Sequence, residues 1–279
     1  MLAILIITGA AFFLELSSSI GKVEIQKRRE SMYAMGFLSM IWGCFIFGGM
    51  ILARGNLGFD IASLPTFGLR AILEIFQAYV SLRAISEASR TTYSFIHAGT
   101  VPIILIIDLF LMNAPIGGWQ IIGMAAILGA MMILSFNHGI DRKGLLFVIL
   151  STVNAAITIS LYKYDISHFN SVEGEQFLIL LILLAYFTIA ARVFYKERPW
   201  QLLKKPVFLA QSATYGIGHV LDSFAYLFGV ASVITVTKRA ASTLWALVSG
   251  RIVFHEKNLF VKITCLCLIV TGIVLLNIR

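Results

Sequence analysis

The sequence predicts an all-α, polytopic membrane protein with ten transmembrane helices. Hydrophobic residues make up 59% of its 279 residues and charged residues only 13%, whereas about 25% of the residues of a soluble domain are charged. Mean hydropathy is +0.89, and apolar runs of about 20 residues, the length that crosses a bilayer, recur along the chain. A soluble fold of this length could not keep so many apolar side chains away from water, but lipid can solvate them.

Each expected span is a run of predominantly apolar residues, whose ends hydropathy defines only to within a few residues. The ten spans are 1–20, 33–52, 65–85, 91–112, 117–136, 143–164, 174–195, 206–228, 231–253 and 259–278. The first span is expected to be retained and not cleaved as a signal peptide, because no basic segment precedes it. The connections are short, so helices adjacent in sequence are predicted to be antiparallel neighbours.

The chain also repeats weakly at an offset of 143 residues, without a gap. The aligned pairs include Ala88-Ser89 with Ala231-Ser232, Thr92 with Thr235, and Gly129 with Gly272. This offset divides the chain into two halves, 1–138 and 139–279, with five expected spans each. Because five is odd, the second half would enter the membrane from the opposite side. The result is the inverted repeat that many secondary transporters share.

The net charge of +8 and the pI of about 9.5 come mainly from basic residues in short loops. No basic domain lies outside the expected spans, so nucleic acid is not an expected partner. Most of the loop charge follows the first, third, fifth, seventh and ninth spans, which by the positive-inside rule places both termini outside. The three cysteines, Cys44, Cys265 and Cys267, lie in apolar runs without metal-ligand spacing and are expected to be packing residues.

The segment 229–276 has the features of a known transporter family. It reads GVASVITVTKRAASTLWALVSGRIVFHEKNLFVKITCLCLIVTGIVLL. Small residues open its first helix, and His255-Glu256 closes that helix where the family has a Gly-Glu-like pair. The segment resembles the closing helix pair of the drug/metabolite transporter superfamily, in its EamA-like branch. The first half is similar in EASRTTYSFIHAGTVPIILIIDLFLM, where Pro102 matches a frequent proline, whereas Asn113 replaces the acidic residue.

This resemblance implies a ten-helix, two-repeat carrier of small organic solutes, for which export is the commoner direction. It does not fix a substrate. It also implies cytoplasmic termini, which is the opposite of what the loop charges predict, so the orientation in the membrane stays open.

Ionisable residues inside the expected spans are the strongest functional signal. A charge at the centre of a membrane helix costs at least about 2.5–3.5 kcal/mol, so such residues usually face a bundle interior or a wet cavity. In span 206–228, four polar residues spaced i, i+4, i+7 and i+11 share one helix face. They are Tyr215, His219, Asp222 and Tyr226. The spacing also allows His219 to interact with Asp222. The alternative to a solute path is a structural hydrogen-bond network between helices.

Other spans carry similar polar stripes. Arg70 and Glu74 lie at i, i+4 in span 65–85 and can partly neutralise each other. Lys238 and Arg239 are adjacent in span 231–253, and neighbours on a helix point about 100° apart, so only Lys238 is expected to face a cavity. The candidate substrate-binding residues are Arg70, Glu74, Gln77, Asn154, Tyr215, His219, Asp222, Tyr226, Lys238, Ser242 and Trp245. The candidates for proton coupling, as carboxyl groups in apolar surroundings, are Glu15, Glu74 and Asp222.

Two residues of span 91–112 suggest a moving part. Pro102 falls in mid-span, where proline frees a backbone carbonyl and kinks a helix. Asp108 is the repeat mate of Arg251, and an ion pair between the two at one gate is a hypothesis.

These features predict a secondary active transporter that moves an amino acid or another amphipathic metabolite by alternating access. Lys238 or Arg70 would hold an anionic group, and the carboxylates a cationic group or a proton. No P-loop motif is present for ATP, and no metal or cofactor is expected. The expected partners are a small-molecule solute and the lipid bilayer, with a homodimer left open. The alternatives are a non-transporting membrane subunit or sensor, and an intramembrane enzyme, for which neither a zinc-binding helix nor a nucleophile elbow is found.

Overall fold

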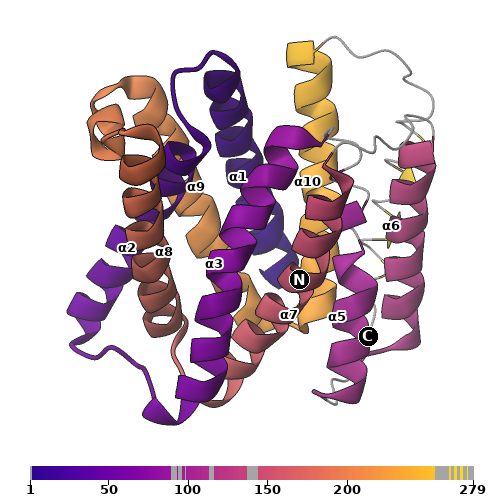
Figure 1. Cartoon of the computed structure of the whole chain (residues 1–279). Coiled ribbons are helices and arrows are strands. Elements are labelled where there is room, and N and C mark those ends of the chain that lie inside the picture. The colour runs from indigo at the N-terminus through magenta and orange to yellow at the C-terminus, as the bar shows by residue number, and fades with distance from the viewer. Residues whose placement is uncertain are drawn as a thin grey trace.

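The structure is a computed structural model of the chain, and it describes residues 2–88, 93, 96–97, 99–112, 116–136 and 144–254, together with residues 264, 267, 268, 271, 272 and 275. Within these residues every regular element is a helix, so the all-α prediction is confirmed there. The α-helices are α1 (Leu2–Gln26), α2 (Met32–Arg54), α3 (Leu64–Glu87), α5 (Thr100–Phe110), α6 (Gly118–Phe136), α7 (Leu145–His168), α8 (Val172–Tyr195), α9 (Pro206–Ala225) and α10 (Ala231–Phe254) (Figure 1). Three short 3-10 helices accompany them: η1 (Ile61–Ser63), η2 (Pro199–Lys204) and η3 (Tyr226–Phe228).

Four of these helices are long and apolar enough to cross a membrane. They are α1 over Leu2–Ile25, α2, α7 and α8, and the described parts of α5 and α6 add shorter apolar segments. Large apolar side chains also point outward, as at Leu52 (84% exposed), Phe110 (78%) and Phe194 (68%). Exposed apolar surface on this scale marks contact with a membrane or another protein, and together with the four apolar helices it indicates that the chain associates with a membrane.

The helix ends of the α2 and α8 segments have recognisable sequence causes. Ser31 precedes α2, and its hydroxyl accepts a hydrogen bond from Ala34 N at 3.1 Å. Ser171 precedes α8 and accepts one from Gly174 N, also at 3.1 Å. Such caps satisfy backbone N–H groups that have no partner within the helix. Gly55 ends α2 in the left-handed region at φ +67°, which glycine adopts without steric cost.

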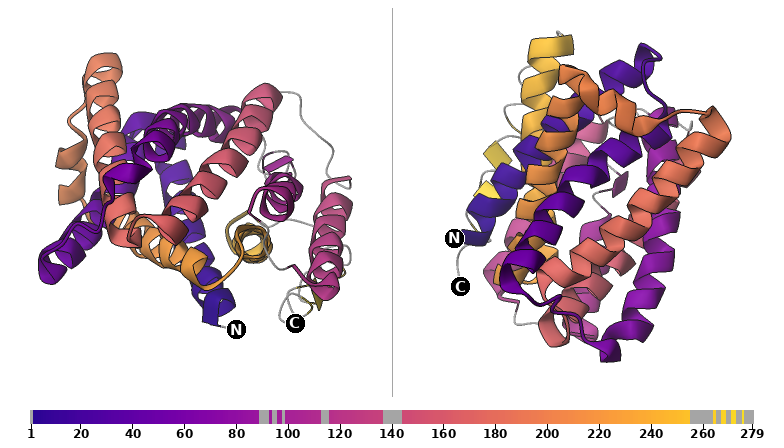
Figure 2. Two further views of the ribbon diagram at one scale, coloured as in Figure 1. Left: turned by 90° about the horizontal axis from the view of Figure 1, so that it is seen from below. Right: turned by 90° about the vertical axis from the view of Figure 1, so that its left-hand side faces the viewer.

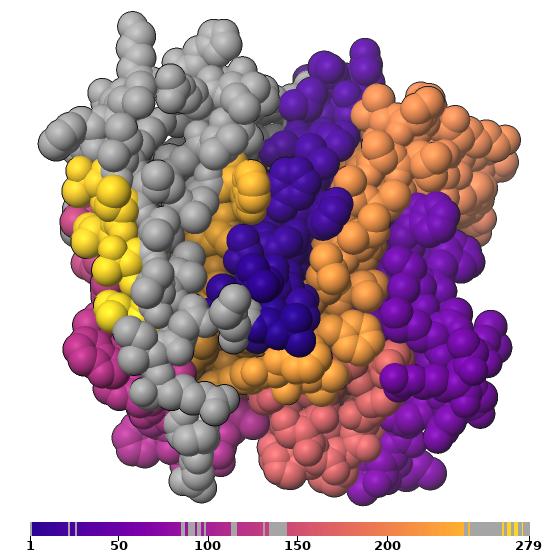
Figure 3. All heavy atoms as spheres, turned by 180° about the vertical axis from the view of Figure 1, so that it is seen from behind, coloured from indigo at the N-terminus to yellow at the C-terminus, as the bar shows by residue number. Residues whose placement is uncertain are grey.

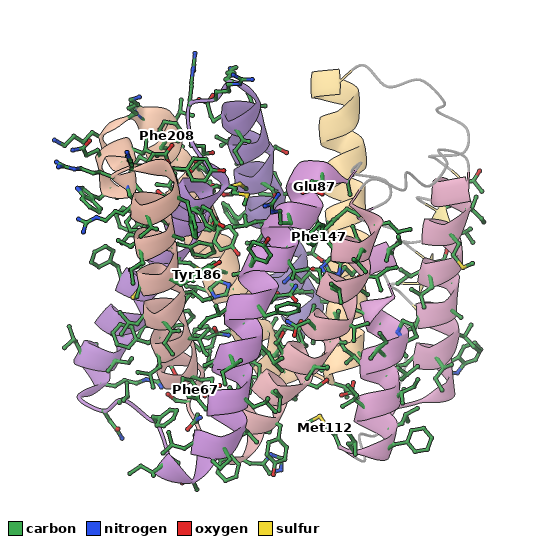
Figure 4. The ribbon with its side chains drawn as sticks, viewed as in Figure 1. Phe67, Glu87, Met112, Phe147, Tyr186 and Phe208 are labelled. Carbon is green, nitrogen blue, oxygen red and sulfur yellow. The ribbon has the colours of Figure 1, made fainter. Side chains whose placement is uncertain are left out.

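The helices pack mostly against partners that are distant in sequence, so the prediction that helices adjacent in sequence are neighbours is wrong for most of the described helices. The main contacting pairs are α1 with α9 and α10, α2 with α8 and α9, α3 with α7 and α8, and α5 with α7 and α10. Figure 3 shows α1 lying between α9 and α10 on the back of the molecule, and Figure 2 shows α6 at the edge of the bundle. One apolar core includes Phe67, Tyr186 and Phe208, which are spaced along the length of the bundle in Figure 4.

The start of α5 differs from what the sequence predicts. α5 begins at Thr100, so Pro102 lies in its first turn and not in mid-helix. The missing N–H of proline is tolerated there, because a first-turn N–H has no intrahelical partner.

Asp108 is buried and accepts a hydrogen bond from Ser232 N at 2.7 Å, so it caps the start of α10. The side chain of Arg251 lies outside the described residues, as do Cys265 and Glu256.

A glycine brings α9 and α2 into close contact. A Cβ atom added at Gly216 would lie 2.5 Å from Trp42 Cβ and 3.2 Å from Gly43 N. Both atoms belong to or adjoin the α2 backbone, so they cannot rotate away. Interfaces between membrane helices commonly use small residues to allow such an approach.

We expect Gly216→Ala to destabilise the protein by about 1–3 kcal/mol, the usual effect of overpacking. Gly49→Ala on α2 is the matched control, since nothing lies within 4 Å of a Cβ at that position. Thermal unfolding of the purified proteins in detergent measures the difference. Equal melting temperatures for the two variants would show that the α2–α9 contact is not tight.

The connection between α1 and α2 carries a buried carboxyl group outside the spanning segments. Glu30 is only 5% exposed, and Gln211 Nε2 donates to its Oε1 at 3.1 Å. Burial raises the pKa of Glu30 from 4.5 to about 8, the hydrogen bond from Gln211 lowers it, and the nearby charges of Glu24 and Glu197 raise it. Glu24 in turn pairs with Lys27 at 3.6 Å.

The shift predicts a pH-dependent stability. Because the folded protein holds the Glu30 proton up to about pH 8 and the unfolded chain releases it near pH 4.5, this group's contribution is complete below pH 4.5 and is lost as the pH rises through about 8. Over that window we expect the melting temperature of the wild type to fall, by a few degrees, relative to that of Glu30→Gln. Melting curves from pH 5 to pH 9 test this, and parallel curves for the two proteins would contradict it.

Candidate functional site

A cavity of about 150 Å³, lined by both polar and apolar side chains, lies inside the bundle and is walled by α2, α3, α7, α8, α9, η3 and α10. Its lining includes seven of the eleven residues predicted to bind substrate. They are Arg70, Glu74, Tyr215, His219, Asp222, Tyr226 and Lys238. The helical periodicity of α3 and α9 therefore places most of the two stripes on one internal surface.

An ion pair joins α9 to α10 at this cavity. Lys238 Nζ lies 2.6 Å from Asp222 Oδ2. The predicted neighbour of Asp222, His219, instead stacks on the ring of Tyr215, with centroids 5.9 Å apart. Asp222 Oδ1 and His219 Nε2 are buried, and neither has a hydrogen-bond partner among the residues that the structure describes.

A second ion pair joins α3 to α8. Arg70 Nη1 lies 2.7 Å from Glu175 Oε1, and these side chains are 3% and 0% exposed. The guanidinium of Arg70 also lies over the ring of Tyr162, 4.5 Å from its centroid. The predicted partner, Glu74, is farther away: Arg70 Nε is 3.7 Å from Glu74 Oε1. Glu175 is thus the main partner of Arg70, and no spacing in the sequence predicts this contact.

Several lining residues were outside the predicted set. Tyr162 and Thr158 come from α7, Gln176 from α8 and Met40 from α2. Thr158 and Tyr162 continue the face of Asn154 at i+4 and i+8, so helical periodicity could have found them. Nothing in the sequence singles out Gln176, which lies in the first turns of α8.

Two predicted residues lie in a hydrogen-bond network between α3 and α7. Asn154 Nδ2 donates to Gln77 Oε1 at 2.8 Å and to Leu73 O at 2.9 Å. Gln77 Nε2 donates to Ser81 Oγ and to Ser151 Oγ. Neither Gln77 nor Asn154 belongs to the cavity lining. Their amides are engaged by the neighbouring helix, which is the structural role that the sequence left open.

Three further predicted residues also lie away from the cavity lining. Trp245 packs edge-on against Phe12 of α1, with ring centroids 4.7 Å apart. Ser242 and Glu15 are half-buried on α10 and α1, and neither is among the residues that line the cavity. The reason is the contact of α10 with α1: the face of α10 that carries Trp245 meets α1.

Arg239 occupies a different face of α10 from Lys238. Arg239 Nη2 lies 3.1 Å from His97 Nε2, and His97 Nδ1 lies 3.4 Å from Thr152 Oγ1. His97 is therefore engaged on both ring nitrogens by α10 and α7, whereas Lys238 lines the cavity.

Polar contacts tie α3 to α7 and α8 at the end of the bundle where α3 begins. Asn170 Nδ2 donates to Glu175 Oε2, and Asn170 Oδ1 accepts from Asp60 N at 2.8 Å. Thr66 Oγ1 donates to Asp165 Oδ1. Glu175 therefore belongs both to the ion pair at the cavity and to the contacts that close this end.

No family model and no curated protein matches the chain. Chains of known structure do match it, 28 in number. One of them, described as "Crystal structure of protein", aligns over 99% of this chain and 96% of its own length, with a TM-score of 0.70 and 16% sequence identity. At that identity the likeness concerns the fold alone. The all-helical arrangement around the cavity is therefore one that proteins of dissimilar sequence also adopt.

Proposed function

We propose that the chain is a secondary active transporter that carries a small organic solute, such as an amino acid or another amphipathic molecule, across a membrane by alternating access. The observation that carries this proposal is the internal cavity lined by ionisable side chains from several helices. Charged groups inside a membrane bundle are costly and are typical of substrate and ion pathways. The fold of an apolar helical bundle is compatible with that role.

The proposed architecture is ten spans in two inverted five-helix repeats, 1–138 and 139–279. Two regularities support it. First, α7, α8 and α9 begin 143, 140 and 142 residues after α1, α2 and α3. Second, the contacts follow the same correspondence of α1, α2 and α3 with α7, α8 and α9. The contact of α1 with α9 corresponds to that of α7 with α3, and the contact of α2 with α8 corresponds to itself. Approximate two-fold symmetry of this kind, with the solute site at the repeat interface, is the arrangement of many secondary transporters.

Alternating access requires contacts between the halves at both ends of the cavity. At one end Glu30 contacts Gln211, and Ser31 Oγ donates to Glu197 Oε2 at 2.6 Å. At the other end Thr66 contacts Asp165. In the proposed cycle one set opens while the other holds. The carboxyl groups of Glu74 and Asp222 are the candidates for carrying a proton, and the family resemblance favours export.

The test is solute flux. We expect purified wild-type protein in liposomes to accumulate a labelled amino acid or amine in a counterflow assay, and Asp222→Asn to reduce that flux about tenfold or more, since removing one partner of a buried ion pair is strongly unfavourable. Glu87→Gln is the control, because Glu87 lies outside the cavity lining, pairs with Arg83 in the preceding turn of the same helix and is 30% exposed.

Each outcome separates one claim. Size-exclusion profiles and melting curves establish that both variants are folded. Unchanged flux in a folded Asp222→Asn protein would contradict the claim that the solute binds in this cavity. Absence of flux for every tested solute in the wild type would favour the alternative of a non-transporting membrane subunit.

A further inference from the structure

The two cations in the cavity wall already have carboxylate partners. Lys238 Nζ contacts Asp222 Oδ2 at 2.6 Å, and Arg70 Nη1 contacts Glu175 Oε1 at 2.7 Å. Among the described residues Arg70 Nε has no hydrogen-bond partner, but the carboxylate of Glu74 lies 3.7 Å from it. A solute carboxylate would compete with Asp222, Glu175 and Glu74 for these two cations, and a protein carboxylate that lost its cation would be left buried and unpaired, which is strongly destabilising.

Acceptors, in contrast, remain available in the same wall. Two carboxylates, Glu74 and Asp222, line the cavity together with two cations, and a third, Glu175, pairs with Arg70 from outside the lining. Asp222 is 8% exposed, and its Oδ1 has no hydrogen-bond partner among the described residues. Glu74 is the more open of the pair that it forms with Arg70, at 21% against 3% exposed. A buried acceptor without a donor is unfavourable, so Asp222 Oδ1 favours an occupant that carries an N–H donor, and the negative charge of the carboxylate favours a positively charged one.

Three tyrosine rings, those of Tyr162, Tyr215 and Tyr226, also line the cavity. The hydroxyl of Tyr162 donates to Ser223 O at 2.9 Å, and that of Tyr226 lies 3.1 Å from Thr235 Oγ1. Both hydroxyls are therefore engaged by the surrounding helices, and the rings contribute aromatic surface to the cavity. Aromatic rings attract cations through their quadrupole, as Arg70 over Tyr162 already illustrates.

The volume limits the size of the occupant. An apolar cavity of about 150 Å³ is known to hold benzene, and the present cavity has the same volume. A single ring with a short polar substituent, or an aliphatic molecule of similar size, is therefore the upper limit in this conformation.

From these contacts we infer that the solute is a small primary or secondary amine, bound as its ammonium ion by Glu74 and Asp222 and packed against the tyrosine rings. A carboxylate on the solute is not required. This inference rests on the proposed transport function and narrows its substrate class from amino acids and amphipathic molecules to cationic amines.

A series of single-ring probes separates the effect of charge from that of shape, because three of them, benzylamine, benzyl alcohol and benzoate, are nearly equal in size, and phenylglycine is benzylamine with an added carboxylate. Benzylamine, benzyl alcohol, benzoate and phenylglycine carry a cation, no charge, an anion and both charges. We expect calorimetry with the wild type in detergent to show benzylamine binding at least tenfold more tightly than the other three. Equal or tighter binding of benzyl alcohol, benzoate or phenylglycine would overturn the inference, and so would absence of measurable benzylamine binding.

Variants test the residues. Glu74→Gln is expected to weaken benzylamine binding at least tenfold without changing the weak binding of benzyl alcohol, and Glu87→Gln on the same helix is expected to change neither. Glu74→Gln is preferred to Asp222→Asn because it leaves both short ion pairs in place. An unchanged benzylamine affinity in a folded Glu74→Gln protein would contradict the assignment.

Flux distinguishes this inference from the proposed function. Amine binding without flux in liposomes would end the transport proposal and leave the amine site standing. Flux of benzoate or phenylglycine, with none of benzylamine, would support transport and end the amine assignment.

Discussion

Every ionised side chain inside this apolar bundle needs a partner, and that requirement determines which helices meet at the cavity. The pair of Arg70 with Glu175 links α3 to α8, and the pair of Lys238 with Asp222 links α9 to α10. Breaking a buried ion pair leaves a charge that neither lipid nor apolar side chains can solvate. Each pair therefore fixes the position of two helices, and the space between the two pairs is where the cavity lies.

The ion pair of Arg70 with Glu175 also connects the cavity with one end of the bundle. Glu175 contacts Arg70 with one carboxylate oxygen and Asn170 with the other, and Asn170 also accepts from Asp60 N. A side chain that shares its two oxygens between the cavity wall and an end contact cannot adjust to one without affecting the other. In the proposed cycle this is a physical link between solute binding and opening of one end.

Sequence periodicity predicted helix faces well and partners poorly. The spacing within α3 and α9 places Arg70, Glu74, His219 and Asp222 on faces that meet in one cavity, because a helix repeats its face regardless of its surroundings. Nothing local identifies the partner of Arg70, since Glu175 lies 105 residues away. Gln77 and Trp245 were predicted to line the cavity, but the helix faces that carry them pack against neighbouring helices. Which neighbour a face meets depends on tertiary packing, which the spacing within one helix does not determine.

Only part of the polar stripe on α3 lines the cavity, and the hydrogen bonds of its residues explain why. Gln77 has partners on its own helix and on α7, which saturate its amide. Two turns earlier on α3, Arg70 Nε is buried and has no hydrogen-bond partner in the described part of the chain, and the same holds for Asp222 Oδ1 across the cavity. Proteins satisfy most of their buried polar atoms, so an unpartnered atom beside a cavity is available to an occupant of that cavity. Whether its polar atoms already have hydrogen-bond partners therefore separates the part of this stripe that packs against α7 from the part that faces the cavity. Charge and spacing alone do not make that distinction.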